Sequence, residues 1–282
     1  ADAMAESEKA FPIQQLDQGH GAELVDHVSI EEPLEIRVVS GPRGNRRSRC
    51  LAITMRTPGN DIELATGFLW TEGIIQSRDQ IVSAQLCGPI DEGRETPNTV
   101  ELELTPDSDF EFQNLQRHFY MTSSCGICGK ASLEILERRD LQPVLNRTTL
   151  SRDIVYRLPT QMRQLQDSFL RTGGIHAAAL FDTAGEIQSI REDIGRHNAM
   201  DKLIGHSLQR ETLPASGSIL VVSGRASFEL LQKALSASVP IFVAVGAPSS
   251  LAIELANRFN ITLIGFTTNR RCNIYTHPSR IV

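Results

Sequence analysis

Residues 219–266 read ILVVSGRASFELLQKALSASVPIFVAVGAPSSLAIELANRFNITLIGF. Three short apolar runs in this stretch alternate with two segments of helical periodicity. The runs are almost continuously apolar, as is typical of parallel strands that are buried on both faces. Strands that alternate with helices in this way predict a βαβαβ unit with a right-handed, parallel sheet. The predicted strands are 219–222, 241–245 and 261–266, and the predicted helices are 226–237 and 250–259.

The residues on either side extend this unit into an α/β domain that we place at 131–282. Two apolar runs are separated by residues typical of a turn, Asp182-Thr183-Ala184-Gly185, and this pattern predicts a hairpin. Gly173-Gly174 closes a helical segment just before that hairpin. The further predicted elements are helices at 131–138, 161–171 and 197–208 and strands at 175–181, 187–191 and 273–277.

The first part of the chain has a different pattern and predicts a smaller α+β block over 28–118. Its clearest strand alternates apolar Val100, Leu102 and Leu104 with two glutamates. Residues 1–27 are polar and irregular, so we expect a flexible tail there. The predicted elements of the block are strands at 33–39, 49–56, 81–87 and 99–105 and a helix at 61–71, in which Phe68 and Trp70 are expected core residues.

Composition excludes some classes of protein. The chain has 282 residues, 40% of them hydrophobic, with a formal net charge of −6, which argues against a general nucleic-acid binder. No apolar run approaches the roughly 20 residues that span a bilayer, and the amino terminus lacks the pattern of a signal peptide. Five cysteines are too few and too scattered for a disulfide framework, so we expect a reducing, cytoplasmic setting.

Cys125-Gly126-Ile127-Cys128-Gly129-Lys130 is the stretch most like a reactive centre. We expect it in a mobile loop, 119–130, that leads into a helix. Two thiols at this spacing permit three readings: half of a structural zinc site, a redox-active dithiol, or a persulfide relay. A zinc site needs two further ligands, and no second pair of suitable spacing exists. Zinc deaminase chemistry is not supported, because the His-x-Glu and Pro-Cys-x-x-Cys signature is absent.

A second candidate site lies where the predicted parallel strands end. Ser223-Gly224-Arg225-Ala226-Ser227 follows one buried strand and opens a helix, where free N–H groups and the helix dipole favour a phosphate. The equivalent turns after the next two strands are 246–249 and 267–271. Ligands bind at this edge of open α/β sheets, so the three turns together indicate a nucleotide-like ligand. The alternative is that they are ordinary turns with solvated arginines.

Two histidines have competing interpretations. His197 could be a base or a ligand, although such a residue more often caps or packs a helix. His176 adjoins a buried strand, and we expect a core histidine with its hydrogen bonds satisfied.

Several stretches together resemble the FdhD/NarQ family of formate dehydrogenase accessory proteins. The resemblance runs from about Val28 to the end of the chain. It is carried by the Cys125–Gly129 stretch and by residues 67–75 (GFLWTEGII), 174–179 (GIHAAA), 191–202 (REDIGRHNAMDK), 223–229 (SGRASFE) and 273–277 (NIYTH).

The resemblance implies a sulfurtransferase-type sulfur carrier. Such proteins accept sulfur from a cysteine desulfurase as a persulfide and deliver it to the molybdenum bis(molybdopterin guanine dinucleotide) cofactor of formate dehydrogenase. On this sequence the persulfide position matches Cys125, with Cys128 as its partner. The family also implies a cytidine-deaminase-like core and a homodimer.

The family's cofactor-contacting segment matches Phe266, Thr267, Thr268, Asn269, Arg270 and Arg271. This chain lacks the Lys-Pro-Gly-Arg-type stretch that some relatives have there. A GDP-like nucleotide is the expected mimic of the client, since guanine nucleotide phosphates suit an edge that carries Arg225, Arg270 and Arg271. No resident metal, nucleic acid or membrane is expected.

Overall fold

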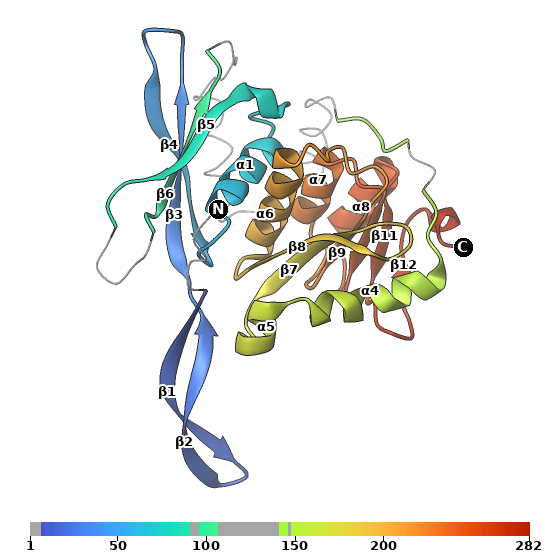
Figure 1. Ribbon diagram of the computed structural model, residues 1–282. Helices are drawn as coiled ribbons and strands as arrows, with labels where there is room; N and C mark the ends of the chain where they lie inside the picture. Colours follow the sequence, from blue (N-terminus) through green and yellow to red (C-terminus); the bar gives the residue numbers. More distant parts are fainter. Residues whose placement is uncertain (1–6, 91–95, 107–140, 146–147) are drawn as a thin grey trace.

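A computed structural model describes residues 7–90, 96–106, 141–145 and 148–282. Two sheets and a projecting ribbon organise this part of the chain (Figure 1). A six-stranded sheet lies within 131–282 and a four-stranded sheet within 28–118. None of the helices in the described ranges combines the length and apolar character that a membrane crossing needs.

The larger sheet has the strand order β12-β11-β10-β9-β7-β8. Its three central strands, β9, β10 and β11, are parallel, and the remaining strands pair antiparallel with their neighbours. The predicted βαβαβ unit is therefore present. The strands are β7 (His176–Phe181), β8 (Ile187–Asp193), β9 (Ile219–Val222), β10 (Ile241–Ala244), β11 (Thr262–Gly265) and β12 (Asn273–Ile274).

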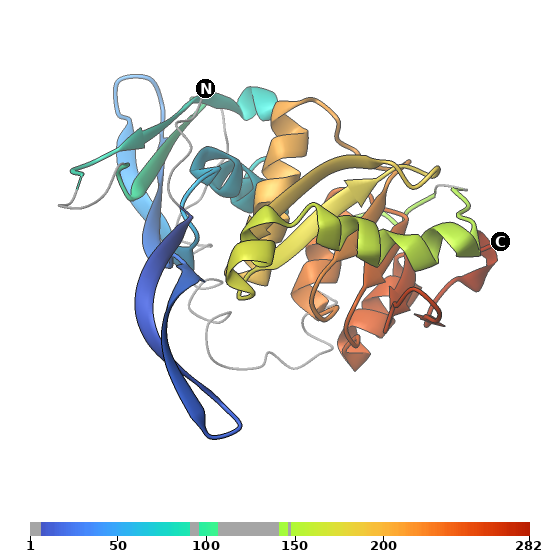
Figure 2. The same cartoon turned by 60° about the horizontal axis from the view of Figure 1, so that its bottom comes forward.

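Helices cover this sheet on both faces, which explains why its central strands are apolar throughout. Alternate residues of β9 divide between two cores: Leu220 and Val222 pack under one helical layer, and Ile219 and Val221 under the other. Figure 2 shows α4 lying across one face, away from the helices of the other. One layer comprises α6 (Arg196–Gln209), α7 (Phe228–Ser236) and α8 (Ser250–Arg258), and the other contains α4 (Arg152–Gln164).

The helix expected at 161–171 is wrong in its bounds. The structure instead has α4, which begins nine residues earlier at Arg152, and a separate α5 (Asp167–Thr172). The helix is interrupted between α4 and α5 because a side chain of another element, β8, caps the start of α5. The Glu192 carboxylate, at the end of β8, accepts hydrogen bonds from the backbone N–H groups of Ser168 and Phe169, both at 3.0 Å. These donors are orphans of the first helical turn, so the cap stabilises a new helix start.

The smaller sheet has the order β4-β3-β6-β5 and one helix packed against it. Its core holds Leu34, Ile36, Val100, Leu102 and the helix residue Leu64, as the alternation of the sequence predicts. The elements are β3 (Glu32–Ser40), β4 (Arg47–Arg56), α1 (Asp61–Thr71), the short helix η1 (Arg78–Gln80), β5 (Ile81–Cys87) and β6 (Thr99–Leu104), with η2 (Pro278–Arg280) near the chain end.

The expected irregular tail over 1–27 is wrong for the residues that the structure describes. β1 (Glu8–Asp17) and β2 (His20–Ser29) form an antiparallel ribbon, which projects from the body in Figure 1. Gln18 and Gly19 join the strands, both with positive φ, as two-residue hairpin loops require. At its base the ribbon is tied to α5, where Arg171 donates to Glu8 at 2.7 Å.

Helices α1 and α6 join the two sheet systems, and they cross at a pair of glycines. A Cβ added to Gly67 would lie 1.8 Å from the Asp201 carbonyl oxygen, and one added to Gly205 would lie 1.8 Å from that of Glu63. The two backbones therefore touch directly. Beside this crossing, buried Lys233 pairs with Asp201 at 2.8 Å and also donates to the Thr71 hydroxyl.

Candidate functional site

The three turns that follow β9, β10 and β11 lie side by side at one edge of the large sheet. The Gly246 N–H donates to the Gly224 carbonyl at 2.9 Å, and the Phe266 N–H donates to the Gly246 carbonyl at 3.0 Å. A side chain at Gly246 would crowd the first turn, since a Cβ there would lie 3.1 Å from the Gly224 oxygen and 3.2 Å from the Arg225 Cα. The predicted juxtaposition of the three turns is confirmed.

The first turn combines a structural serine with an exposed arginine. The Ser223 hydroxyl accepts a hydrogen bond from the Ala177 N–H at 2.9 Å, so it ties the end of β9 to β7. Arg225 is exposed and free to reach a ligand. At the start of α7, the Ser227 hydroxyl is buried and has no hydrogen-bond partner among the described residues. Ser227 lies in the predicted anion-binding turn, although its own hydroxyl was given no role there.

The third turn exposes an aromatic ring beside two cations. Phe266 is 42% exposed and has a φ of 50°, a conformation that non-glycine residues rarely adopt and that often marks functional sites. The Thr268 hydroxyl accepts from the N–H groups of Arg270 at 3.3 Å and Arg271 at 3.1 Å. This turn leaves both arginine side chains exposed. Their chemistry suits an anion, and the ring suits a planar base.

The two remaining polar residues of this segment, Thr267 and Asn269, differ in burial. Thr267 is 1% exposed, and its hydroxyl has no hydrogen-bond partner in the described part of the chain. Asn269 is exposed to solvent.

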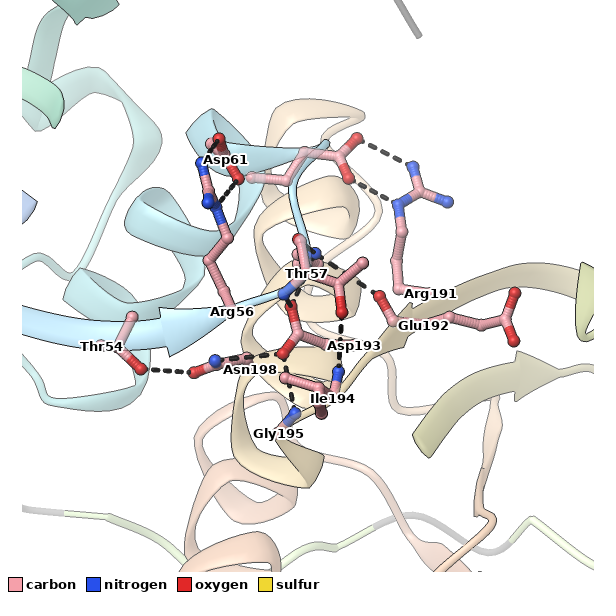
Figure 3. A network of polar contacts seen from close by, with 12 residues as sticks. Thr54, Arg56, Thr57, Asp61, Arg191, Glu192, Asp193, Ile194, Gly195 and Asn198 are labelled. Atoms are coloured by element: carbon pink, nitrogen blue, oxygen red, sulfur yellow. Dashed lines mark hydrogen bonds and ion pairs between the residues drawn. The ribbon is translucent and has the colours of Figure 1, made fainter. Parts of the chain in front are cut away.

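The start of α6 lies at the same edge and is fixed by a buried network (Figure 3). The Asp193 carboxylate pairs with Lys202 at 2.7 Å and accepts from the Gly195 N–H at 2.8 Å and the Asn198 amide at 3.1 Å. It also accepts from the Thr57 N–H at 3.2 Å, across 136 positions of sequence. Much of the 191–202 stretch thus joins the smaller sheet to the edge of the larger one.

His176 differs from the expected core histidine. It opens β7, its ring is half buried, and neither ring nitrogen bonds to a described residue. A Cβ on Gly224 would lie 3.4 Å from this ring, so the histidine packs against the first turn. Burial and then the charge of Arg196 lower the pKa of His176, whereas Asp193 raises it.

His197 is the second residue of α6, and its ring nitrogen Nε2 is buried without a described hydrogen-bond partner. In the described structure His197 does not cap the helix, and packing against its neighbours leaves the hydrogen bond of Nε2 unmade. Four of the eight such buried atoms in the described ranges belong to residues at this edge: Arg196, His197, Ser227 and Thr267. Sequence reasoning gave Arg196 no role, although its position at a predicted helix start was a signal.

Cys125 and Cys128 lie outside the described residues, as do the loop expected at 119–130 and the helix expected at 131–138. The three described cysteines are Cys50, Cys87 and Cys272, and partial burial raises the pKa of each thiol. Raised pKa values disfavour the thiolate, which is the nucleophilic form. Within the described ranges, no three His, Cys, Asp or Glu side chains gather as a metal site would require.

Comparison with known proteins gives one consistent family. The FdhD/NarQ family model matches residues 30–282. The chain is 45% identical over 259 residues to the sulfur carrier protein FdhD of Mycobacterium tuberculosis, covering 90% of this chain and 91% of that protein. It is 46% identical over 263 residues to the protein of that name from Streptomyces avermitilis, covering 91% and 89%.

A solved structure shares the fold. A candidate formate dehydrogenase accessory protein from Desulfotalea psychrophila superimposes with a TM-score of 0.74 at 22% identity, covering 98% of this chain and all of that one.

Proposed function

The chain belongs to the FdhD/NarQ family, and from this premise we propose that it is a sulfur carrier for the molybdenum cofactor of formate dehydrogenase. The relatives' shared name, sulfur carrier protein FdhD, is the observation that carries the proposal. The raised pKa values of Cys50, Cys87 and Cys272 disfavour these three cysteines as the carrier. Cys125 and Cys128 remain as the carrying pair.

The chemistry proceeds by thiol exchange. The Cys125 thiolate attacks the outer sulfur of a desulfurase persulfide, so that the desulfurase cysteine leaves as a thiolate and Cys125 gains the sulfur. The Cys128 thiolate then attacks Cys125 Sγ and breaks the bond to the carried sulfur. That sulfur leaves as hydrosulfide, and its two electrons come from the two cysteines, which form a disulfide. A cellular dithiol reduces this disulfide for the next cycle.

The client of the transfer is the molybdenum bis(molybdopterin guanine dinucleotide) cofactor, which we treat as cargo. The residues at the sheet edge fit the nucleotide end of such a molecule. Phe266 offers a face for a base, Arg225, Arg270 and Arg271 offer charge for phosphates, and the Thr267 hydroxyl lacks a described partner. A GDP-like nucleotide should therefore bind here as a mimic.

The remaining parts of the proposal follow from the same family membership. The partners are a cysteine desulfurase as donor, formate dehydrogenase as recipient and a second copy of the chain in a homodimer. The setting is the cytoplasm, where thiols stay reduced. The cytidine-deaminase-like character of the larger sheet also stays a prediction, to which the parallel βαβαβ unit lends support.

Intact-protein mass spectrometry tests sulfur uptake. The protein is incubated with a cysteine desulfurase and cysteine, and wild type is compared with Cys125→Ala, Cys128→Ala and the control Cys272→Ala. We expect added sulfur on wild type and on the control, and none on Cys125→Ala. Wild-type protein that gains no sulfur would refute the carrier role.

A binding protein for the cofactor, without sulfur chemistry, is the second candidate. The unpartnered polar atoms at the sheet edge favour it. It predicts that Cys125→Ala supports formate dehydrogenase maturation as well as wild type does.

A further inference from the structure

His197 presents an unmet polar group at the sheet edge. Its Nε2 atom is buried and bonds to no described residue. A buried donor or acceptor without a partner costs about 1–3 kcal/mol, so native structures leave few of them. The atom lies on the second residue of α6, at the end of the helix where N–H groups point outward. This combination is expected where a ligand completes the hydrogen bonding.

The His197 ring is held neutral at physiological pH. Burial, then the charges of Arg196 beside it and of Lys233 on α7, lower its pKa to about 4. Glu229 on α7 acts in the opposite direction, and His176 on β7 lowers the pKa slightly further. Such a ring is a poor base near neutral pH, because an efficient base has a pKa close to the working pH. In its Nε2–H tautomer it is a hydrogen-bond donor that does not titrate in this range.

Further hydrogen-bond donors lie at the starts of α6 and α7. No side chain of the described residues caps the first turn of α6 or of α7. The N–H groups of those turns and the positive ends of the two helix dipoles therefore remain available to an anion. The Ser227 hydroxyl at the α7 start is buried and unpartnered among the described residues. Gly224, which has no side chain, packs against the His176 ring, since a Cβ there would lie 3.4 Å from that ring.

The network in Figure 3 holds the start of α6 in place. Asp193 receives hydrogen bonds from Gly195 and Asn198, and the Ile194 N–H donates to the Thr57 hydroxyl at 3.1 Å. Asn198 is held in turn by the Met55 carbonyl at 2.7 Å. The residues immediately before and after Arg196 and His197 are thus fixed to the smaller sheet. A donor held this rigidly loses little entropy when it binds a ligand.

We propose that His197, as a neutral imidazole, donates a hydrogen bond through Nε2 to a phosphate oxygen of the nucleotide bound at this edge, together with the Ser227 hydroxyl. The inference rests on the proposed function and adds the start of α6 to the binding site. Asp193, Asn198 and Thr57 are positioning residues, which act through the helix start.

GDP binding measured by calorimetry tests the inference, with folding of each variant checked by circular dichroism. His197→Gln keeps an amide donor near the Nε2 position and should bind within about threefold of wild type, whereas His197→Leu should bind at least about tenfold more weakly, as for a lost hydrogen bond to a charged group. The matched control is His20→Leu on the exposed ribbon, which should bind like wild type.

Wild-type protein supplies a second readout that does not depend on any variant folding well. The His197 imidazole resonances, assigned by their loss in His197→Gln, should keep neutral-ring shifts from neutral pH down to about pH 5 and should move on saturation with GDP. Unchanged resonances, or wild-type affinity in His197→Leu, would overturn the role of His197 while leaving the nucleotide site intact. If wild type binds no GDP, the nucleotide site itself fails; sulfur uptake by Cys125 is measured separately.

Discussion

Replacing Gly205 by alanine should destabilise the protein, although alanine is the better helix former. The new Cβ would lie 1.8 Å from the Glu63 carbonyl oxygen and 2.8 Å from the Gly67 nitrogen. Both are backbone atoms, so the clash cannot be relieved by the rotation of a side chain. The oxygen must recede to at least 3.4 Å for ordinary contact, and α1 must move away from α6 as a body.

The expected magnitude follows from two opposing effects. Overpacking costs about 1–3 kcal/mol, and a backbone clash this close belongs at the upper end. Alanine in place of glycine inside a helix returns up to about 1 kcal/mol. The net loss should be about 2 kcal/mol, or a fall in Tm of about 4–8 °C for a chain of this size.

Urea unfolding followed by circular dichroism measures this difference, with Gly217→Ala as the matched control. A Cβ at Gly217 meets no heavy atom within 4 Å, so that variant should match or slightly exceed wild type. If Gly205→Ala unfolds at the same urea concentration as wild type or at a higher one, the helices do not touch at this crossing.

Two further predictions concern the charged groups between the sheets. Lys202→Met leaves the Asp193 carboxylate buried without its cation and should cost about 3–5 kcal/mol, while Lys9→Met on the exposed ribbon should be neutral; equal unfolding free energies for the two would contradict this. Burial raises the pKa of Glu63, but hydrogen bonds and charge from Arg191 and then His206 outweigh burial and hold the pKa below 4.5. The ion pairs of Glu63 therefore stabilise the fold above pH 4.5, and this stabilisation is lost as the pH falls through the lowered pKa. Unfolding free energies of wild type and Glu63→Gln should therefore converge on acidification, and a gap that stays constant with pH would exclude this linkage.

The elements that the sequence predicted well are those whose own residues determine them. Helix α1 begins and ends where its pattern predicts, at Asp61 and Thr71. The central strand β9 is also predicted at both ends, because four consecutive apolar residues are bounded by polar turns. The helix expected at 226–237 is shorter, Phe228–Ser236, because the residues after Gly224 bond across to the next turn before the helix starts.

The ribbon was missed although a signal was present. Phe11 and Ile13 alternate with polar or small residues, and Gly19 supplies the turn. The segment is otherwise polar, and its side chains stay largely exposed, so the usual core-facing pattern is absent. The break between α4 and α5 carries no local signal at all, because its cap, Glu192, lies more than 20 residues away in the sequence.

The candidate site also has one part that local sequence determines and one part that only tertiary contacts determine. The meeting of three turns at one edge follows from parallel strands, whose ends coincide, and it could be predicted. The unpartnered nitrogen of His197 could not be predicted, because it depends on what α7 and β7 bring to it. The sequence can place a histidine at a helix start, but whether its ring is satisfied is a property of the tertiary structure.

The 191–202 stretch combines residues that hold the two sheets together with His197, for which we propose a binding role. Asp193 and Lys202 contact Thr57, just after β4, and Asn198 contacts Met55 within β4. Arg196 and His197 instead have buried side-chain nitrogens that no described residue satisfies. A helix start is stiff once its flanking residues are fixed, so every contact to the smaller sheet also sets the position of the imidazole. On the proposed function, the smaller block therefore positions the site without lining it, and we expect variants that weaken the contact of Asp193 and Asn198 with the smaller block to lower ligand affinity.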